Sequence, residues 1–600
     1  MLAETHRQLR CCVLLATAAA LGGCGALPRA PWQDSTDTPE ELPRVAADVT
    51  GVDSAVAANV RAHLALLREP CTAPAARHER IAADAEAETR RALRAQGYYE
   101  PVVDAQLLRD ADTCPRLEVT IQPGDRVQLD DVEATVRGPG RADPAFTAFI
   151  DGLELKAGTP LDHGLYDTTR ARIDTWAADH GYFDGRFLTR ELRVQPTQRR
   201  ASARLVYDSS ARYGFGDLTI TQTPFALDED VVRRFFDFAP GEHYTSTRIA
   251  EIHAALRASD YFERSDIRPR IGARADGRVP LDVSLAPRRR HAFSTGVGFS
   301  TDEALRARFE YLDRRVNARG HRFIAAARAS AIAQQFSTEY RLPRARPRSE
   351  WLSVQAGVRR ESVDTFDTLE AQATLSETHE RPYGFVETRF VELNRQSFDI
   401  ATQDGTGLFL TPGLRYAKIR QDHALYPRRG YRVRAEIRAA SETLASDTSL
   451  VRAVIAGGYL TTLPWQDRLL LRAEVGGLWA ADFARLTPSL RFLTGGDASV
   501  RGYGYQDLGP VDARGNVVGG RYLGVASVEY EHALTGHWGL AGFVDAGNAF
   551  GGTGRDTGLK TGVGVGVRWR SPIGPIRVDL AHPLDDAAQV RLHLRVGPDL

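Results

Sequence analysis

The sequence lacks net charge and long hydrophobic runs. Its 77 basic residues are balanced by 77 acidic ones, whereas a nucleic-acid-binding protein would carry a basic excess. The apolar run at residues 11–23 is too short for a membrane-spanning helix, which needs about 20 apolar residues, and no later run is longer. The 600 residues are too many for one hydrophobic core, so we expect several domains and no spanning helix.

Catalytic and metal-binding signatures are also missing. The sequence has no G-x-S-x-G, no H-E-x-x-H, no Walker glycine loop and no Cys/His spacing typical of a metal site. His423, His582 and His593 are isolated, and we interpret them as polar strand residues. We therefore predict no catalytic residue, metal or cofactor, and no enzyme. A hydrolase with catalytic residues scattered along the sequence stays an open alternative.

The N-terminus reads as an export signal. Arg7 and Arg10 precede the apolar run, which predicts a signal peptide at residues 1–24. The segment Leu21-Gly22-Gly23-Cys24 resembles the lipobox of bacterial lipoproteins, which implies that Cys24 is lipidated; an ordinary cleavage site is the alternative. Residues 25–45 are rich in Pro, Asp, Thr and Glu and are expected to form a flexible tether.

Few cysteines remain for the exported part of the chain. Of the 5 in the sequence, 3 lie in the signal region, which leaves Cys71 and Cys114. Both fall in one predicted domain, and an exported protein meets conditions that permit disulfides. We expect a Cys71–Cys114 disulfide, with two unlinked buried thiols as the alternative.

A unit of about 80 residues recurs before residue 287. Its marker is an aromatic pair at the end of a helical stretch, in Gln96-Gly97-Tyr98-Tyr99, His180-Gly181-Tyr182-Phe183 and Ser259-Asp260-Tyr261-Phe262. Alternating strands follow, for example at residues 117–121 and 203–207. The repeat predicts three small α+β domains, at residues 46–125, 126–209 and 210–287.

Residues 288–600 alternate between apolar and polar or small side chains. Val563, Val565 and Val567 alternate with glycines, and Ile576, Val578 and Leu580 with charged residues. Tilted strands of roughly 9 to 11 residues with one apolar face form the lipid-facing wall of an outer-membrane barrel. An open sheet edge in hydrocarbon would leave backbone groups unsatisfied, so the sheet must close. The length accommodates about 16 antiparallel strands.

One glycine-rich tract, residues 495–505, stands among these strands. Its segment Val500-Arg501-Gly502-Tyr503 resembles the loop motif of the outer-membrane assembly factors of the BamA/TamA superfamily. The segments around Glu529 and Asp545, Ser-Val-Glu-Tyr and Phe-Val-Asp-Ala-Gly-Asn, resemble late-strand motifs of the same family. The last strands resemble its TamA branch most. An ordinary hairpin with a surface arginine is the alternative to this reading.

The resemblance implies a function. It implies that the three repeats are POTRA domains in the periplasm and that the barrel lies in the outer membrane, where it assembles or secretes β-barrel or autotransporter-type proteins through a lateral seam. Implied partners are the client proteins, the lipid bilayer and a TamB-like protein anchored in the inner membrane. Arg501 would latch a plugging loop to Glu529 and Asp545, unless these charges form only a solvated network. The alternative function is a transport channel, either a two-partner-type secretion pore or a phospholipid conduit.

Overall fold

The computed structural model describes residues 43–109, 113–423, 426–572, 574–585 and 590–596. The predicted signal peptide and Cys24 therefore lie outside the described residues. The chain divides into two compact units, Met1–Ala178 with Asp184–Ala211, and Asp179–Phe183 with Arg212–Leu600. Among the residues that the structure describes, no helix is long and apolar enough to cross a membrane.

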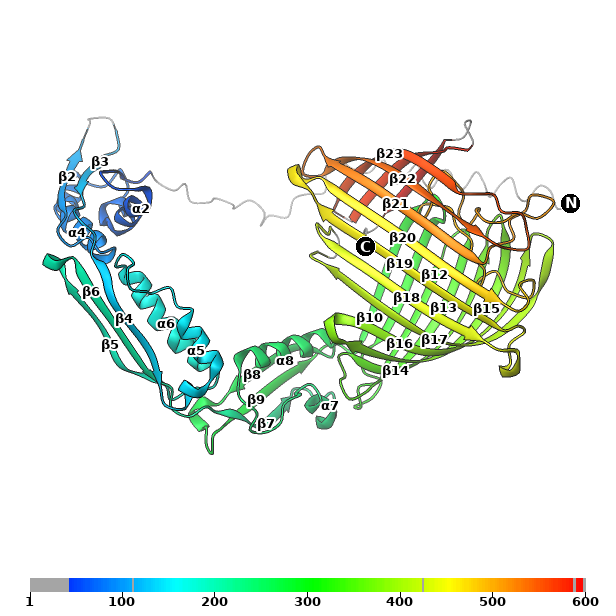
Figure 1. Cartoon of the computed structure of the whole chain (residues 1–600), viewed down its shortest axis with the longest axis horizontal. Coiled ribbons are helices and arrows are strands. Elements are labelled where there is room, and N and C mark those ends of the chain that lie inside the picture. Colours follow the sequence, from blue (N-terminus) through cyan, green and yellow to red (C-terminus); the bar gives the residue numbers. More distant parts are fainter. Residues whose placement is uncertain (1–42, 110–112, 424–425, 573, 586–589, 597–600) are drawn as a thin grey trace, which may run out of the picture. The chain divides into compact units, whose positions relative to one another are not determined.

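Three small modules share one plan (Figure 1). In each, a three-stranded sheet has the last strand at its centre, parallel to the first strand and antiparallel to the second. The first comprises β1 (Ala46–Thr50), α2 (Ser54–His63), α3 (Ala75–Ala82), α4 (Ala85–Ala95), β2 (Val102–Leu108) and β3 (Arg116–Gln122). The second comprises β4 (Gln128–Arg137), α5 (Pro144–Asp151), α6 (His163–Asp179), β5 (Arg186–Gln195) and β6 (Arg200–Asp208). The third comprises β7 (Gly214–Gln222), α7 (Glu229–Arg233), α8 (Ser246–Ala258), β8 (Phe262–Pro269) and β9 (Arg278–Pro287).

The repeated aromatic pair marks the turn that ends the last helix of each module. Gly97, Gly181 and Asp260 occupy equivalent places and have φ angles of 89°, 86° and 63°. A left-handed residue there ends a helix, and glycine or aspartate adopts this conformation more easily than most residues. The turn directs Tyr182 and Tyr261 into the core, where they are 3% and 2% exposed. The sequence repeat thus reflects a repeated helix end.

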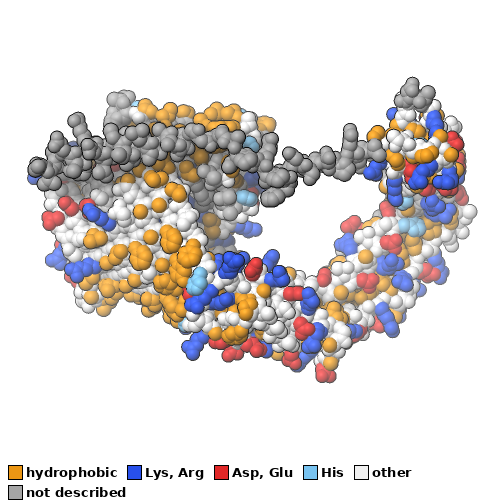
Figure 2. All heavy atoms as spheres, turned by 180° about the vertical axis from the view of Figure 1, so that it is seen from behind, with side chains coloured by type: hydrophobic (Ala, Val, Ile, Leu, Met, Phe, Trp, Pro, Cys, Tyr) orange, Lys and Arg blue, Asp and Glu red, His pale blue; other side chains and the backbone are white. Residues whose placement is uncertain are grey.

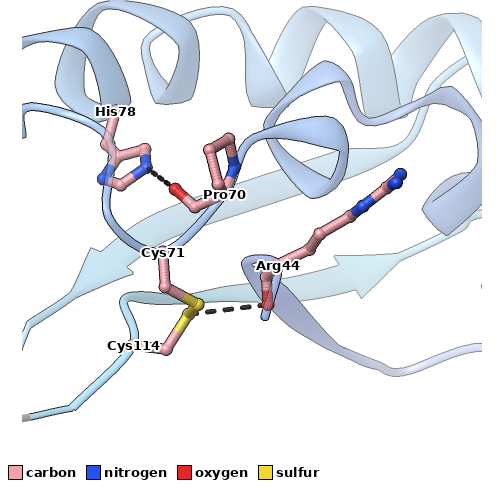
Figure 3. The surroundings of a disulfide bond; sticks show 5 residues. All are labelled: Arg44, Pro70, Cys71, His78 and Cys114. Carbon is pink, nitrogen blue, oxygen red and sulfur yellow. Dashed lines mark hydrogen bonds between the residues drawn. A yellow bond between two sulfur atoms is a disulfide. The ribbon is translucent and has the colours of Figure 1, made fainter. Parts of the chain in front are cut away.

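The first module contains the expected disulfide between Cys71 and Cys114 (Figure 3). The sulfur of Cys114 lies 3.5 Å from the carbonyl oxygen of Arg44. The predicted tether at residues 25–45 was too long, because its last residues belong to this module. The Pro43 carbonyl accepts a hydrogen bond from the Cys71 backbone at 2.7 Å, and Val45 is 3% exposed.

The rest of the chain forms a closed antiparallel barrel of sixteen strands, each paired with its sequence neighbours, so the predicted fold class is confirmed. Three strands have 16, 16 and 19 residues, more than the 9 to 11 expected. The strands are β10 (His291–Ser300), β11 (Ala304–Asp313), β12 (Arg322–Ala329), β13 (Ala333–Pro343), β14 (Glu350–Ser362), β15 (Phe366–Arg381), β16 (Phe385–Ile400), β17 (Gln403–Gln421), β18 (Gly430–Ala440), β19 (Leu450–Thr462), β20 (Arg468–Ala480), β21 (Tyr522–Ala533), β22 (Trp538–Phe550), β23 (Lys560–Ser571), β24 (Gly574–Pro583) and β25 (Arg591–Val596).

Side chains alternate between the two faces of the barrel wall. On β21, Ser527 and Glu529 are 3% and 1% exposed, whereas Val528 and Tyr530 are 50% and 44% exposed. The outward set is apolar along most strands, and Figure 2 shows hydrophobic side chains spread over the part of the wall that it presents. This alternation suits a wall between lipid and a polar lumen.

The third module contacts one end of the barrel. The turn between β11 and β12 accepts hydrogen bonds from the Asp228 backbone at Ala318 (2.8 Å) and from the Tyr261 hydroxyl at Gly320 (2.5 Å). Because the strands are antiparallel, the loop between β20 and β21, residues 481–521, leaves the barrel at the opposite end.

The barrel closes weakly between its first and last strands. Among the residues that the structure describes, strands β10 and β25 share a single register pair, Ser300 with Arg595. Every other pair of neighbouring barrel strands shares six or more, with β24 and β25 at the minimum of six. We call this junction the seam. It joins the first strand of the barrel, β10, to the last, β25.

Candidate loop latch in the barrel lumen

The long loop at residues 481–521 folds into the barrel on an apolar base. Phe483, Leu486 and Phe492 are 3%, 0% and 2% exposed, and they belong to a buried cluster with residues of four barrel strands. Beyond this base, Gly495, Gly496 and Gly502 have φ angles near +100°. Such angles favour glycine, and they let the tip turn tightly against the inner wall. The apolar base and the glycines together place the tip of the loop inside the lumen.

Arg501 lies at the centre of this tip and is 3% exposed. Its Nε and Nη2 donate to the two oxygens of Asp545 at 2.6 and 3.0 Å, and its backbone N–H donates to the same carboxylate at 3.1 Å. Its Nη1 donates to Glu529 at 2.7 Å. The guanidinium carbon also lies 3.3 Å from the ring centre of Phe543, a cation–π contact. Arg501 therefore meets both carboxylates proposed for it, in the two-pronged geometry that suits arginine.

Two further charged residues complete the network, and the sequence did not single them out. Asp579 on β24 accepts from Arg501 Nη1 at 3.0 Å. Arg568 on β23 donates to Glu529 at 2.7 Å and also contacts Asp579 and Glu531. The alternation of side chains along the strands already places Arg568 and Asp579 on the inner face. It does not tell how far along the barrel axis each residue lies, and therefore which residues it meets. We call Arg501, Glu529, Asp545, Arg568 and Asp579 the latch.

Three glycines on β23 give the latch its space. A Cβ atom on Gly562 would lie 1.9 Å from the Arg501 carbonyl oxygen. On Gly564 it would lie 2.3 Å from the Phe543 ring, and on Gly566 1.8 Å from Asp579. The valines between them face outward, so the Gly-Val alternation seen in the sequence has a steric cause on its inner side. The inner face of β23 therefore has no side chain at these three positions, which leaves room for the loop backbone, Phe543 and Asp579.

The remaining motif residues flank Arg501. Val500 is fully buried, and the Gly502 N–H donates to the ring of His593 at 2.9 Å. The Tyr503 hydroxyl contacts Asp585. His593, which we interpreted as a polar strand residue, is 3% exposed and lies within the lumen network. Ion pairs and hydrogen bonds thus hold the loop against the inner wall of the barrel, and the charged side chains of the latch pair with one another.

Comparisons with known proteins agree with this architecture. The Omp85 superfamily domain matches residues 291–597, about half of the chain, and the first POTRA domain of TamA matches residues 47–123. The outer membrane protein assembly factor BamA of Nitratidesulfovibrio vulgaris is 23% identical over 381 residues, which are 61% of this chain and 48% of that protein. The chain thus spans about half the length of this relative.

One solved structure shows the same fold, and a second has a lower TM-score. BamA from Haemophilus ducreyi lacking POTRA domains 1–3 has a TM-score of 0.65 at 12% identity and covers 78% of this chain and 99% of that one. CdiB from Acinetobacter baumannii has a TM-score of 0.45 at 12% identity, covering 78% of this chain and 89% of that one. With the family match over the barrel, the three modules and the lumen loop, the chain belongs to the Omp85 superfamily and is an outer-membrane β-barrel protein with periplasmic POTRA domains.

Proposed function

We propose that this protein is an assembly factor of the TamA type, which inserts or secretes β-barrel or autotransporter-type proteins through its seam. The observation that carries the proposal is the single register pair between β10 and β25. The match of residues 47–123 to the first POTRA domain of TamA supports this branch of the superfamily.

The seam offers a physical route to assembly. Residues 291–299 of β10 have no register partner on β25 in the described part of the chain. In hydrocarbon each unsatisfied backbone group costs several kcal/mol, so this edge favours pairing with another strand. An incoming client strand can supply that pairing by strand addition. The process needs no nucleotide and no chemical catalysis.

The lumen loop distinguishes this proposal from the transport channel. A loop that sits on an apolar base and is tied by Arg501 to three buried carboxylates obstructs the lumen. A steady pore would need to displace it. We therefore place assembly through the seam ahead of a secretion pore or a phospholipid conduit.

The POTRA domains are the proposed docking site for a partner. We propose a TamB-like periplasmic protein, since TamA-type POTRA domains are the part of the chain that the periplasm can reach. Capture of partners by the full-length protein from envelope extract, with the bound proteins identified, tests this. A control in which residues 46–125 are deleted reports partners that bind elsewhere.

Reconstitution tests the main function. The full-length protein is placed in phospholipid vesicles and given an unfolded outer-membrane barrel as client. We expect faster client folding, seen as the compact heat-resistant form on a gel, than in empty vesicles, and no steady conductance across a planar bilayer. Stable conductance without any acceleration of folding would reject the assembly function in favour of the channel.

A further inference from the structure

The tip of the lumen loop reaches both sides of the seam through one side chain. The carboxylate of Asp497 accepts hydrogen bonds from the Thr301 hydroxyl at 2.9 Å and from the Asp302 backbone at 3.4 Å, both in the turn that follows β10. The same carboxylate contacts Nδ1 of His593 on β25. Asp497 is 8% exposed. A single buried side chain therefore connects the first and last strands of the barrel.

The protonation of His593 follows from its two contacts. Its Nε2 accepts a hydrogen bond from the Gly502 N–H at 2.9 Å, so that nitrogen carries no proton in this arrangement. The ring proton therefore sits on Nδ1 and is donated to Asp497. Gly502 directly follows Arg501, so His593 on β25 connects the seam to the loop segment that carries the latch arginine.

Asp302 and Asp497 are joined by a second hydrogen bond, in which Asp302 is the acceptor. Its carboxylate accepts from the Asp497 backbone at 2.7 Å, so the two aspartates bind each other's N–H groups. Burial and the neighbouring Asp497 carboxylate raise the pKa of Asp302 to about 6. Burial acts to raise the pKa of Asp497, but the contacts with His593, Thr301 and the Asp302 N–H together outweigh burial and hold that pKa below its ordinary value. Asp497 is thus the more acidic of the two aspartates, and hydrogen bonds to a charged group are the stronger kind.

Thr301 ties these contacts to the strand edge itself. Its backbone N–H donates to the Leu594 carbonyl at 3.1 Å, and its hydroxyl accepts from the Leu594 N–H at 3.1 Å while donating to Asp497. One hydroxyl thus serves both the seam and the loop. A further side-chain hydrogen bond crosses the seam from Arg306 on β11 to the Val596 carbonyl at 3.1 Å.

We propose that Thr301, Asp302, Asp497 and His593 form a clasp that holds the seam closed at the end of the barrel remote from the third module. The clasp makes the lumen loop a control element of the seam, because the seam cannot widen there while Asp497 binds both sides. This inference rests on the proposed function in assigning a use to the opening. The closed-to-open equilibrium itself is a property of the barrel that can be measured without any client.

The test measures the width of the seam. Spin labels on Val297→Cys and Leu592→Cys, two lipid-facing positions that are 78% and 51% exposed on either side of the seam, report their separation in full-length protein in lipid. The parent protein without these cysteines reports any label on native thiols. Asp497→Ala is compared with Asp512→Ala, a matched change in the same loop whose carboxylate bonds residues 514 and 516.

We expect Asp497→Ala to raise the ratio of long to short separations about tenfold or more, which equals about 1.4 kcal/mol, and Asp512→Ala to leave it unchanged. An unchanged ratio in folded Asp497→Ala overturns the clasp. If Asp497→Ala does not fold, Thr301→Val and Thr301→Ser are compared instead. Thr301→Val should raise the ratio of long to short separations about fivefold through loss of the hydroxyl, whereas Thr301→Ser keeps the hydroxyl and should leave the ratio unchanged. Equal ratios in the two variants overturn the clasp. A widened seam in a variant that assembles clients no differently supports the clasp and contradicts the proposed function.

Discussion

Replacement of Arg501 is the most direct perturbation of the latch. Arg501→Ala removes the guanidinium donors that the loop offers to Asp545, Glu529 and Asp579, which are 0%, 1% and 4% exposed. Removing one partner of a buried ion pair costs about 3 to 5 kcal/mol, because the other charges stay buried. We expect a loss of this size, since Asp545 would keep the hydrogen bonds from Ser527 and from the backbone N–H of residue 501, and a 4.0 Å contact with Arg472, but would lose its two guanidinium hydrogen bonds. Lysine should restore part of the loss, because one ammonium cannot reproduce the two-pronged contact.

The assay has two readouts. The temperature at which the barrel loses its compact form on a gel reports stability, and protease digestion of the intact barrel reports release of the loop. Arg514→Ala, a change at an exposed arginine of the same loop, is the matched control and should affect neither. A loop that stays protected in Arg501→Ala would refute the latch.

A double-mutant cycle then isolates the contact. Arg501→Ala combined with Glu529→Ala should cost at least about 1 kcal/mol less than the two single losses summed, because both changes break one network. Glu529 also binds Arg568, so its own loss includes that second contact. Strictly additive losses would show that Arg501 and Glu529 are energetically independent despite their 2.7 Å contact.

Three further predictions concern other parts of the chain. Mass spectrometry under non-reducing conditions should find Cys71 and Cys114 linked, and loss of the link should destabilise the first domain by about 4 kcal/mol from loop entropy; freely alkylated thiols would reject the bond. Metabolic labelling with a palmitate analogue should mark Cys24 and not Cys24→Ala, whereas unlabelled protein cleaved beyond that residue would reject lipidation. Gly562→Ala should expose the lumen loop to protease, because its Cβ would lie 1.9 Å from a loop carbonyl, whereas Gly542→Ala, with nothing within 4 Å, should not.

The sequence predicted the architecture well because periodicity has a direct physical cause. Alternation along residues such as Val563, Val565 and Val567 reflects one lipid-facing side of a strand, and the aromatic repeat reflects a left-handed helix end at Gly97 and its equivalents. The strand count followed from chain length. The individual lengths did not, because the span of a bilayer sets only a minimum length for a strand, and β17 has 19 residues.

Only the latch residues that belong to short sequence motifs could be predicted from the sequence. Arg501 and its carboxylates came from short segments that resemble a family, and the structure places them in contact. Asp579 and Arg568 needed the register between β23 and β24, which alternation does not contain. The contact of Asp302 with Asp497 joins residues 195 apart, and that of His593 with Asp497 joins residues 96 apart, so no local pattern marks them.

The central claim is that client proteins pass through the seam, and locking the seam tests it most directly. Ser300→Cys with Arg595→Cys places two cysteines at the one register pair that joins β10 and β25. Ser353→Cys with Ser376→Cys is the matched control, because these serines face each other across β14 and β15 with their hydroxyls 2.8 Å apart, away from the seam. Client folding in vesicles is measured before and after oxidation and again after reduction. Oxidation should abolish the acceleration in the seam pair, spare the control pair and be reversed by reductant, whereas full activity with the seam crosslinked would contradict the account.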